Sequence, residues 1–185
     1  MKPAYALLFA AVACDAVAAD FRSADFGMSR EQVRASEPDA KWLASGEQIG
    51  FITEVAGLSV QATYVFINDE FYMGGYSVVE PHADDNAYLN DYDRLKSLLA
   101  EKYGKPQTDD TLWRNDLFRR EPSSYGMAIS IGHMEKMAYW DLDKMEVAIR
   151  LSGDNYDVDL WIFYESKAHK DAVSAASKKS QLDGL

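Results

Sequence analysis

Cysteine is nearly absent from the sequence, whose 185 residues include only Cys14. It lies in an N-terminal segment in which Lys2 precedes an apolar run over residues 4–13, followed by small residues. A cation, a short apolar run and a small-residue end are typical of a secretory signal peptide. We expect cleavage after Ala19, with Ala18 as the alternative. The mature chain would then hold no thiol for a disulfide, a metal site or catalysis.

Residues 11–14, Ala-Val-Ala-Cys, also resemble the box at which bacterial lipoproteins are cut and lipidated, although the usual Leu three residues before the cysteine is missing. In that case Cys14 becomes the lipid-bearing N-terminus. Two interpretations therefore stand: a signal peptide over residues 1–19 followed by one domain over residues 20–185, or an envelope lipoprotein anchored through Cys14. The first predicts a periplasmic or secreted protein.

The sequence has no long hydrophobic run and comparatively few basic residues. The apolar run over residues 4–13 is shorter than the roughly 20 residues that a membrane-spanning helix needs, so we expect no transmembrane segment. Lys and Arg number 19 against 30 Asp and Glu, which gives a formal net charge of −11. Excess carboxylate does not attract nucleic acid or anionic membrane surfaces, so neither is an expected partner.

The familiar catalytic motifs are also missing. The chain contains no G-x-S-x-G, H-E-x-x-H, P-loop or G-x-G-x-x-G pattern, which excludes conventional hydrolases, kinases and dehydrogenases, and no cofactor is predicted. His82 lies in a loop near Glu80, Asp84 and Asp85, and His133 lies on a predicted strand. These histidines support only a third hypothesis, an unfamiliar hydrolase, because the aspartates are equally explained as helix caps.

Hydrophobic periodicity supplies the positive evidence for structure. Ser29 with Gln32 three residues later forms a capping box, and Pro38 ends the short helix that follows. An apolar stripe predicts a long helix over residues 84–103, and the polar segment 165–182 is a further predicted helix. Alternation of period two predicts antiparallel strands over residues 48–55, 60–66, 71–79, 111–118, 126–134, 144–151 and 156–164.

The two halves of the chain share an order of elements. Residues 20–80 and 84–165 each contain a helix, then a proline, then a tryptophan and a run of strands. The predicted fold class is therefore α+β. We expect an antiparallel sheet built from two helix-plus-meander units, one long amphipathic helix packed on it and a C-terminal helix.

The stretch Gly27-Met28-Ser29-x-Glu31-x-Val33 resembles the G-M-[ST]-x-x-x-V opening of small exported bacterial proteins. These include the small lipoprotein of the outer-membrane barrel assembly machine and proteins with the β-lactamase-inhibitor-protein fold. In those families a capped short helix packs on an antiparallel sheet, and the sheet face or its loops bind another protein. The resemblance implies the same fold type, and an envelope protein as partner.

Aromatic residues are the better candidates for binding. Alternation cannot place all of Trp113, Tyr125, Tyr139, Trp140 and Trp161 on inward faces. Either some form a second layer beneath the C-terminal helix, or they form a binding face, since Trp and Tyr are common anchors of interfaces. The leading hypothesis is a non-catalytic binding protein of the bacterial envelope that uses Trp113, Tyr139, Trp140 and Trp161.

Paired aspartates support an alternative function. Asp157 and Asp159 point to the same side of a predicted strand, and Asp154 lies in the turn before it. Carboxylate oxygens are ligands that Ca²⁺ prefers, so these three residues are candidates for a metal site. The alternative hypothesis is therefore a periplasmic protein that binds Ca²⁺ or a small ligand.

Overall fold

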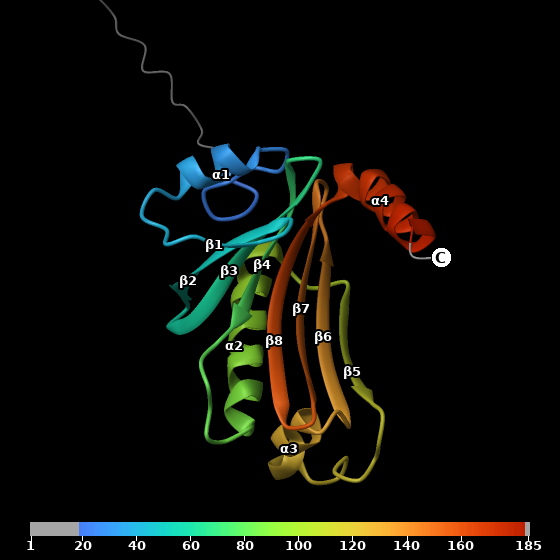
Figure 1. Ribbon diagram of the computed structural model, residues 1–185. Helices are drawn as coiled ribbons and strands as arrows, with labels where there is room; N and C mark the ends of the chain where they lie inside the picture. The colour runs from blue at the N-terminus through green and yellow to red at the C-terminus, as the bar shows by residue number, and fades with distance from the viewer. Residues whose placement is uncertain (1–18, 184–185) are drawn as a thin grey trace, which may run out of the picture.

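A computed structural model describes residues 19–183 of the chain (Figure 1). The predicted leader up to residue 18, with Cys14, lies outside the described residues. The helices are α1 (Arg30–Ser36), α2 (Asn86–Tyr103), α3 (Tyr125–Ser130) and α4 (Lys170–Asp183), with 3-10 turns η1 (Pro122–Ser124) and η2 (Lys167–His169). The strands are β1 (Leu43–Ser45), β2 (Gln48–Val55), β3 (Leu58–Ile67), β4 (Glu70–Val78), β5 (Thr108–Trp113), β6 (Met134–Asp141), β7 (Met145–Asp154) and β8 (Asp157–Ser166).

The strands form one sheet in the order β1-β2-β3-β4-β8-β7-β6-β5, and all neighbours are antiparallel. Each half of the chain contributes a meander of four strands preceded by a helix. The last strand of each meander, β4 or β8, lies in the middle of the sheet, where the two pair with each other. The predicted α+β class and the two helix-plus-meander units are confirmed.

The capping box that begins α1 is present. The Ser29 hydroxyl accepts a hydrogen bond from the Gln32 backbone N–H at 3.3 Å, and the Gln32 side-chain oxygen accepts one from the Ser29 N–H at 2.8 Å. The helix ends at Ser36, two residues before Pro38, because proline disfavours helical backbone in the residue before it. Val33, on the inner side of α1, is fully buried.

The long helix α2 packs its predicted stripe against the sheet. Tyr92, Leu95 and Leu99 are buried, and the helix contacts β7 and β8. Asp84 stabilises its start, where its side-chain oxygen accepts a hydrogen bond from the Asn86 N–H at 2.9 Å. Gly104 follows the last turn with φ of +84°, a backbone conformation that glycine adopts without strain.

Between β5 and β7 the structure differs from the sequence prediction. Residues 126–134 were predicted as a strand, but α3 occupies Tyr125–Ser130 and β6 begins only at Met134. A Cβ atom at Gly126 would lie 2.4 Å from the backbone nitrogen of Asn86, so α3 abuts the start of α2. This contact is long-range, and strand periodicity within the segment gives no sign of it.

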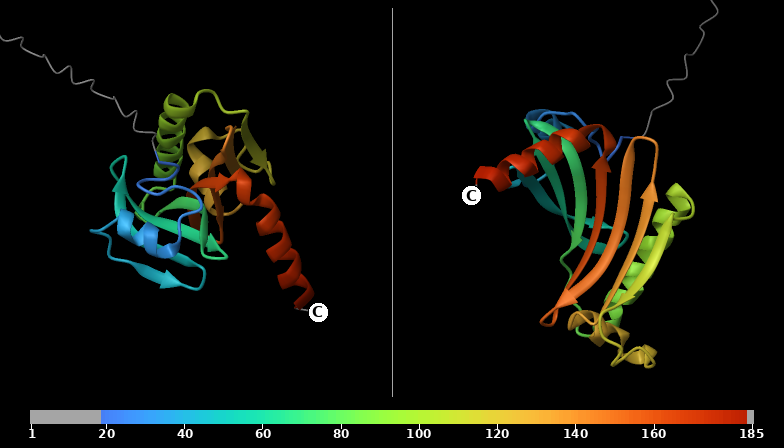
Figure 2. Two further views of the ribbon diagram at one scale, coloured as in Figure 1. Left: turned by 90° about the horizontal axis from the view of Figure 1, so that it is seen from above. Right: turned by 90° about the vertical axis from the view of Figure 1, so that its right-hand side faces the viewer.

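The sheet has two different faces. On the covered face, α2 and the N-terminal segment bury a continuous core, which includes Phe21, Tyr64, Trp140 and Ile149. We call the opposite side, to which Trp161 points, the open face. In Figure 2, α2 and α4 lie on opposite sides of the twisted sheet, and α4 extends away from it. No helix within residues 19–183 is long and apolar enough to cross a bilayer.

Candidate binding surface

The central strand β8 divides its side chains between the two faces. Leu160, Ile162 and Tyr164 are buried on the covered face. The alternate residues Trp161 and Phe163 point to the open face and are half-buried. Because side chains along a strand alternate, this arrangement places two large aromatic rings side by side at the middle of the open face.

Trp161 and Phe163 stack on each other, with ring centroids 5.6 Å apart and ring planes 8° from parallel. They form one wall of a hollow of about 160 Å³. Val65 from β3 and Met73 from β4 line the same hollow. Its full lining consists of Gln48, Thr63, Val65, Met73, Gly74, Gly75, Ser77, Trp161 and Phe163.

Two adjacent glycines shape the sheet at this hollow. Gly75 is the register partner of Phe163, and having no side chain it leaves the flank of that ring uncovered. A Cβ atom at Gly75 would lie 2.9 Å from the Ile162 carbonyl oxygen, so a larger residue would force the strands to shift. Gly74 serves the covered face instead, where the ring of Phe21 would be only 2.5 Å from an added Cβ.

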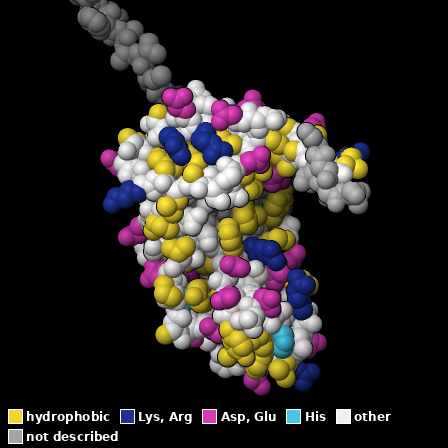
Figure 3. Space-filling model, in the orientation of Figure 1, with side chains coloured by type: hydrophobic (Ala, Val, Ile, Leu, Met, Phe, Trp, Pro, Cys, Tyr) yellow, Lys and Arg dark blue, Asp and Glu magenta, His cyan; other side chains and the backbone are white. Residues whose placement is uncertain are grey.

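Carboxylates flank the aromatic pair along β8. On the same side of β8, Asp157 and Asp159 precede Trp161, and Glu165 follows Phe163. Figure 3, viewed from the side on which α4 projects, shows hydrophobic side chains below α4 with both acidic and basic side chains around them. The open face therefore combines an apolar centre with carboxylates at both ends of β8.

The upper margin holds a row of carboxylates across three strands. Asp141, Glu146 and Glu165 are successive register partners on β6, β7 and β8. Lys170, at the start of α4, lies 2.5 Å from Glu146, and Lys167 forms an ion pair with Asp141. The Lys170 hydrogen bond is the main reason that the pKa of Glu146 is lowered. Cations from the chain itself therefore already bind part of this row.

Two of the four predicted binding residues lie on the open face. Trp161 is at its centre, and Tyr139 stands two strands away in the same register row as Phe163. Burial raises the pKa of the Tyr139 hydroxyl, and its hydrogen bond to Glu146 raises it further. Tyr139 is therefore a hydrogen-bond donor to Glu146 at the upper margin of the face.

The other two predicted residues serve the interior. Trp140 is fully buried, and its indole N–H donates a hydrogen bond to the Gly104 carbonyl at 2.8 Å. Trp113 is half-buried and packs edge-on against Tyr125 at α3, with centroids 5.2 Å apart. Neither joins the aromatic pair. Phe163, which was not among the predicted binding residues, takes their place, and its i, i+2 spacing from Trp161 is the sequence signal that identifies it.

The aspartates of the alternative hypothesis lie at the β7–β8 hairpin. Asp154 and Asp157 are register partners across a two-residue turn, in which Asn155 and Tyr156 have positive φ. Asp159 faces Ser152 further along the strands. Within residues 19–183, no group of three or more His, Cys, Asp or Glu side chains is placed to hold a metal ion. The hairpin carboxylates instead form the lower acidic margin of the open face.

The two histidines considered for catalysis stand apart from this surface. His82 Nε2 lies 2.6 Å from an Asp91 oxygen, and the other Asp91 oxygen accepts a hydrogen bond from Arg94 at 2.9 Å. This pair joins the loop before α2 to the helix. His133 packs near the ring of Phe118, and its Nδ1 is buried without a hydrogen-bond partner in the described part of the chain.

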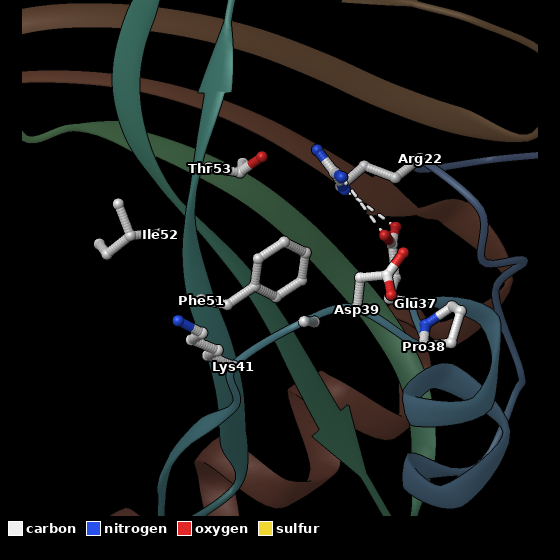
Figure 4. A pocket seen from close by; sticks show the side chains of 9 residues that line it. Arg22, Glu37, Pro38, Asp39, Lys41, Phe51, Ile52 and Thr53 are labelled. Atoms are coloured by element: carbon white, nitrogen blue, oxygen red, sulfur yellow. Dashed lines mark hydrogen bonds and ion pairs between the residues drawn. The ribbon is translucent and has the colours of Figure 1, made fainter.

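A second depression of about 470 Å³ lies between the α1–β1 connection and β2 (Figure 4). At its base Arg22 forms two hydrogen bonds with Glu37, at 2.9 and 3.3 Å, and the Tyr64 hydroxyl donates to Glu37 at 3.1 Å. The Arg22 guanidinium also lies 5.1 Å from the centroid of the Phe51 ring. Because these charges satisfy one another, the group acts as a clamp that holds the N-terminal segment on the sheet.

A third depression, of about 430 Å³, adjoins the open face. Glu135 pairs there with Arg150 at 2.6 Å and with Arg114 at 3.1 Å. The Arg150 hydrogen bond, opposed by partial burial and helped by Arg114, lowers the pKa of Glu135. Arg150 is the register partner of Trp161, but its charge is already directed to Glu135.

Comparison of the chain with protein-family models, with curated proteins and with solved structures found no match. The functional interpretation therefore depends on the geometry of the open face and on the patterns in the sequence.

Proposed function

We propose that the protein is a non-catalytic binding protein of the bacterial cell envelope, and that its open face binds another envelope protein. The observation that carries this proposal is the stacked pair Trp161 and Phe163 beside an apolar hollow on a face that α2 leaves uncovered. Partly buried aromatic rings in the centre of a surface, with polar groups around them, are the usual anchors of protein interfaces.

The proposed location is supported by the N-terminal pattern. Residues 1–19 have the order of a secretory leader, and the alternative, lipidation at Cys14, also leads to the envelope. The acidic composition is compatible with a soluble domain in that compartment and unfavourable for nucleic acid.

A binding role is favoured over catalysis because the charged side chains considered as catalytic groups pair with one another within the fold. His82 and Asp91 join two elements, and Arg22 and Glu37 satisfy each other within a clamp. Neither pair points into an apolar hollow of the kind that seats a substrate. The only apolar hollow among the depressions described above is the one beside Phe163, and its lining carries no charged side chain.

Photo-crosslinking in the producing cell tests the proposal. A photoreactive phenylalanine analogue replaces Phe163 in one variant and Ser97, exposed on α2, in a matched control. We expect a discrete protein adduct from position 163, absent at position 97 and lost when Trp161→Ala is added. The same adducts from both positions, or an adduct that is insensitive to Trp161→Ala, would contradict the proposal.

A further inference from the structure

We infer that the partner presents an extended segment along β8, with two apolar side chains over Trp161 and Phe163 and a lysine or arginine at the next alternate position on each side. This inference rests on the proposed function and adds the chemistry of the segment that the open face recognises. It follows from the order of side chains on β8, from the hollow, and from the charges at its two ends.

The open-face side of β8 has a simple pattern. Its five consecutive positions are, in chain order, Asp157, Asp159, Trp161, Phe163 and Glu165. A strand advances about 3.4 Å per residue, so same-side positions recur about every 6.8 Å. A second extended chain lying over β8 has the same spacing. Its alternate side chains can therefore meet these positions one to one.

The carboxylates at the two ends favour cations. Glu165 stands directly opposite Glu146, a pair of like charges across the strands, and Asp159, which faces Ser152, is followed outward by a second such pair, Asp157 and Asp154. Such pairs destabilise a sheet, and a bound cation relieves the repulsion. Of these five carboxylates, only Glu146 has an ion-pair partner among the side chains that the structure describes, namely Lys170.

The chain itself provides a precedent for this recognition. Lys167 and Lys170, at the root of α4, reach the upper row of carboxylates at Asp141 and Glu146. The row thus binds lysine side chains in the geometry of the sheet. Glu165, the next member of the row, directly follows the aromatic pair on the open face.

The hollow fits the apolar part of such a segment. Its volume of about 160 Å³ is that of about five water molecules at roughly 30 Å³ each, which is enough for one apolar side chain. Met73 lines the hollow, and its flexible thioether lets the wall adapt to the shape of the side chain. The second apolar side chain would lie on the exposed part of the Trp161 ring.

An acidic segment does not suit the same surface. Arg150, the register partner of Trp161, and Arg114 are both directed to Glu135. An anionic side chain over β8 would therefore meet Asp159 or Glu165 instead of a free cation. Electrostatic complementarity of this kind discriminates between partners and speeds the encounter with the right one.

The test uses two synthetic peptides, Lys-Thr-Leu-Thr-Leu-Thr-Lys and Glu-Thr-Leu-Thr-Leu-Thr-Glu, titrated into the purified protein. Binding is followed by NMR through the indole N–H signal of Trp161, which is assigned with Trp161→Phe. In low salt we expect the lysine peptide to bind about tenfold more tightly than the glutamate peptide. Combining Asp159→Asn with Glu165→Gln, or raising the salt to about 0.5 M, should reduce the difference to about twofold.

Equal or tighter binding of the glutamate peptide would overturn the inference, as would a lysine peptide that shifts signals outside the open face. If both peptides bind equally and both lose binding in Phe163→Ala, which keeps the Trp161 signal, the open face binds segments but lacks the inferred charge preference, and the inference fails. If neither peptide shifts the Trp161 signal at millimolar concentration, the inference fails. The crosslink from position 163 then decides the proposed function separately.

Discussion

Trp161 and Phe163 stack on the open face with their ring centroids 5.6 Å apart, on the strand where the two halves of the sheet meet. Between them in sequence, Ile162 is buried on the covered face. One set of alternate side chains on β8 thus belongs to the core. The other set includes the two aromatic rings, which are partly exposed to solvent. This division allows the open face to be altered without removing core side chains.

Replacing Trp161 by alanine should therefore be tolerated by the fold. The ring is half-buried and stacks on Phe163 outside the core, so we expect the free energy of unfolding to fall by about 1–2 kcal/mol. Urea unfolding of the purified variant measures this loss. A loss above about 4 kcal/mol would mean that Trp161 belongs to the core.

Trp140→Ala should lower the free energy of unfolding much more than Trp161→Ala does. The ring is fully buried and its N–H bonds to the Gly104 carbonyl, so the change leaves a cavity and an unpaired carbonyl. We expect a loss of about 3–5 kcal/mol in the same unfolding experiment. Similar losses for Trp140→Ala and Trp161→Ala would contradict the assignment of these residues to different faces.

The sequence predicted those helices and strands that are specified by residues close to one another in the chain. The capping box at Ser29 and Gln32 needs only four residues, and the stripe of Tyr92, Leu95 and Leu99 needs a few helical turns. The alternation over residues 156–164 likewise predicted β8. The helix α3 was missed because Gly126 packs against the start of α2, some forty residues earlier in the chain.

Stability should fall in acid partly through Glu37. Burial acts to raise the pKa of Glu37, but the hydrogen bonds and charge of Arg22 outweigh it and hold that pKa below its ordinary value of 4.5. A carboxyl with a lowered folded-state pKa stabilises fully above its unfolded-state pKa and loses this contribution as pH falls through the folded-state pKa. We therefore expect the free energy of unfolding to drop as pH decreases below about 4.5.

The variant Glu37→Gln isolates this contribution. It removes the charge that faces Arg22, so we expect it to unfold more easily at pH 7 by about 1–2 kcal/mol and to show a shallower decline in acid. Urea unfolding between pH 3 and 7 provides the measurement. Glu135→Gln is the matched control, and it should have a smaller effect because its arginine partners are about half exposed. An unchanged acid profile in Glu37→Gln would refute the clamp.

Calcium should not stabilise the protein. Asp154 and Asp157 face each other across the hairpin while Asp159 lies further along β8, so the three do not supply the converging oxygens that Ca²⁺ requires. We expect the melting temperature to change by less than about 1 °C in millimolar Ca²⁺, since only a ligand that prefers the folded state raises it. A rise of several degrees that disappears in Asp157→Asn would restore the calcium hypothesis.

The candidate surface was only partly predictable from the sequence. Trp161 and Tyr139 were named because the sequence has more aromatic side chains than the core-facing positions of its strands can hold. That excess does not show which of the aromatic side chains lie on the open face. Trp140 was named because no strand was predicted over residues 135–143, which left its face unassigned; β6 covers Met134–Asp141, and its register turns Trp140 into the core. The hollow beside Gly75 depends on pairing between β4 and β8, which are separated in the chain by two α-helices and three strands.

The most direct test of the central claim is the equilibrium affinity for the protein that is crosslinked at position 163, measured with the wild type, Trp161→Ala and Leu98→Ala. Leu98 is an exposed apolar residue on α2 and controls for a general loss of surface hydrophobicity. We predict at least a tenfold loss for Trp161→Ala and less than a twofold change for Leu98→Ala. Unchanged affinity in Trp161→Ala, or an equal loss in both variants, would contradict a binding surface centred on Trp161 and Phe163.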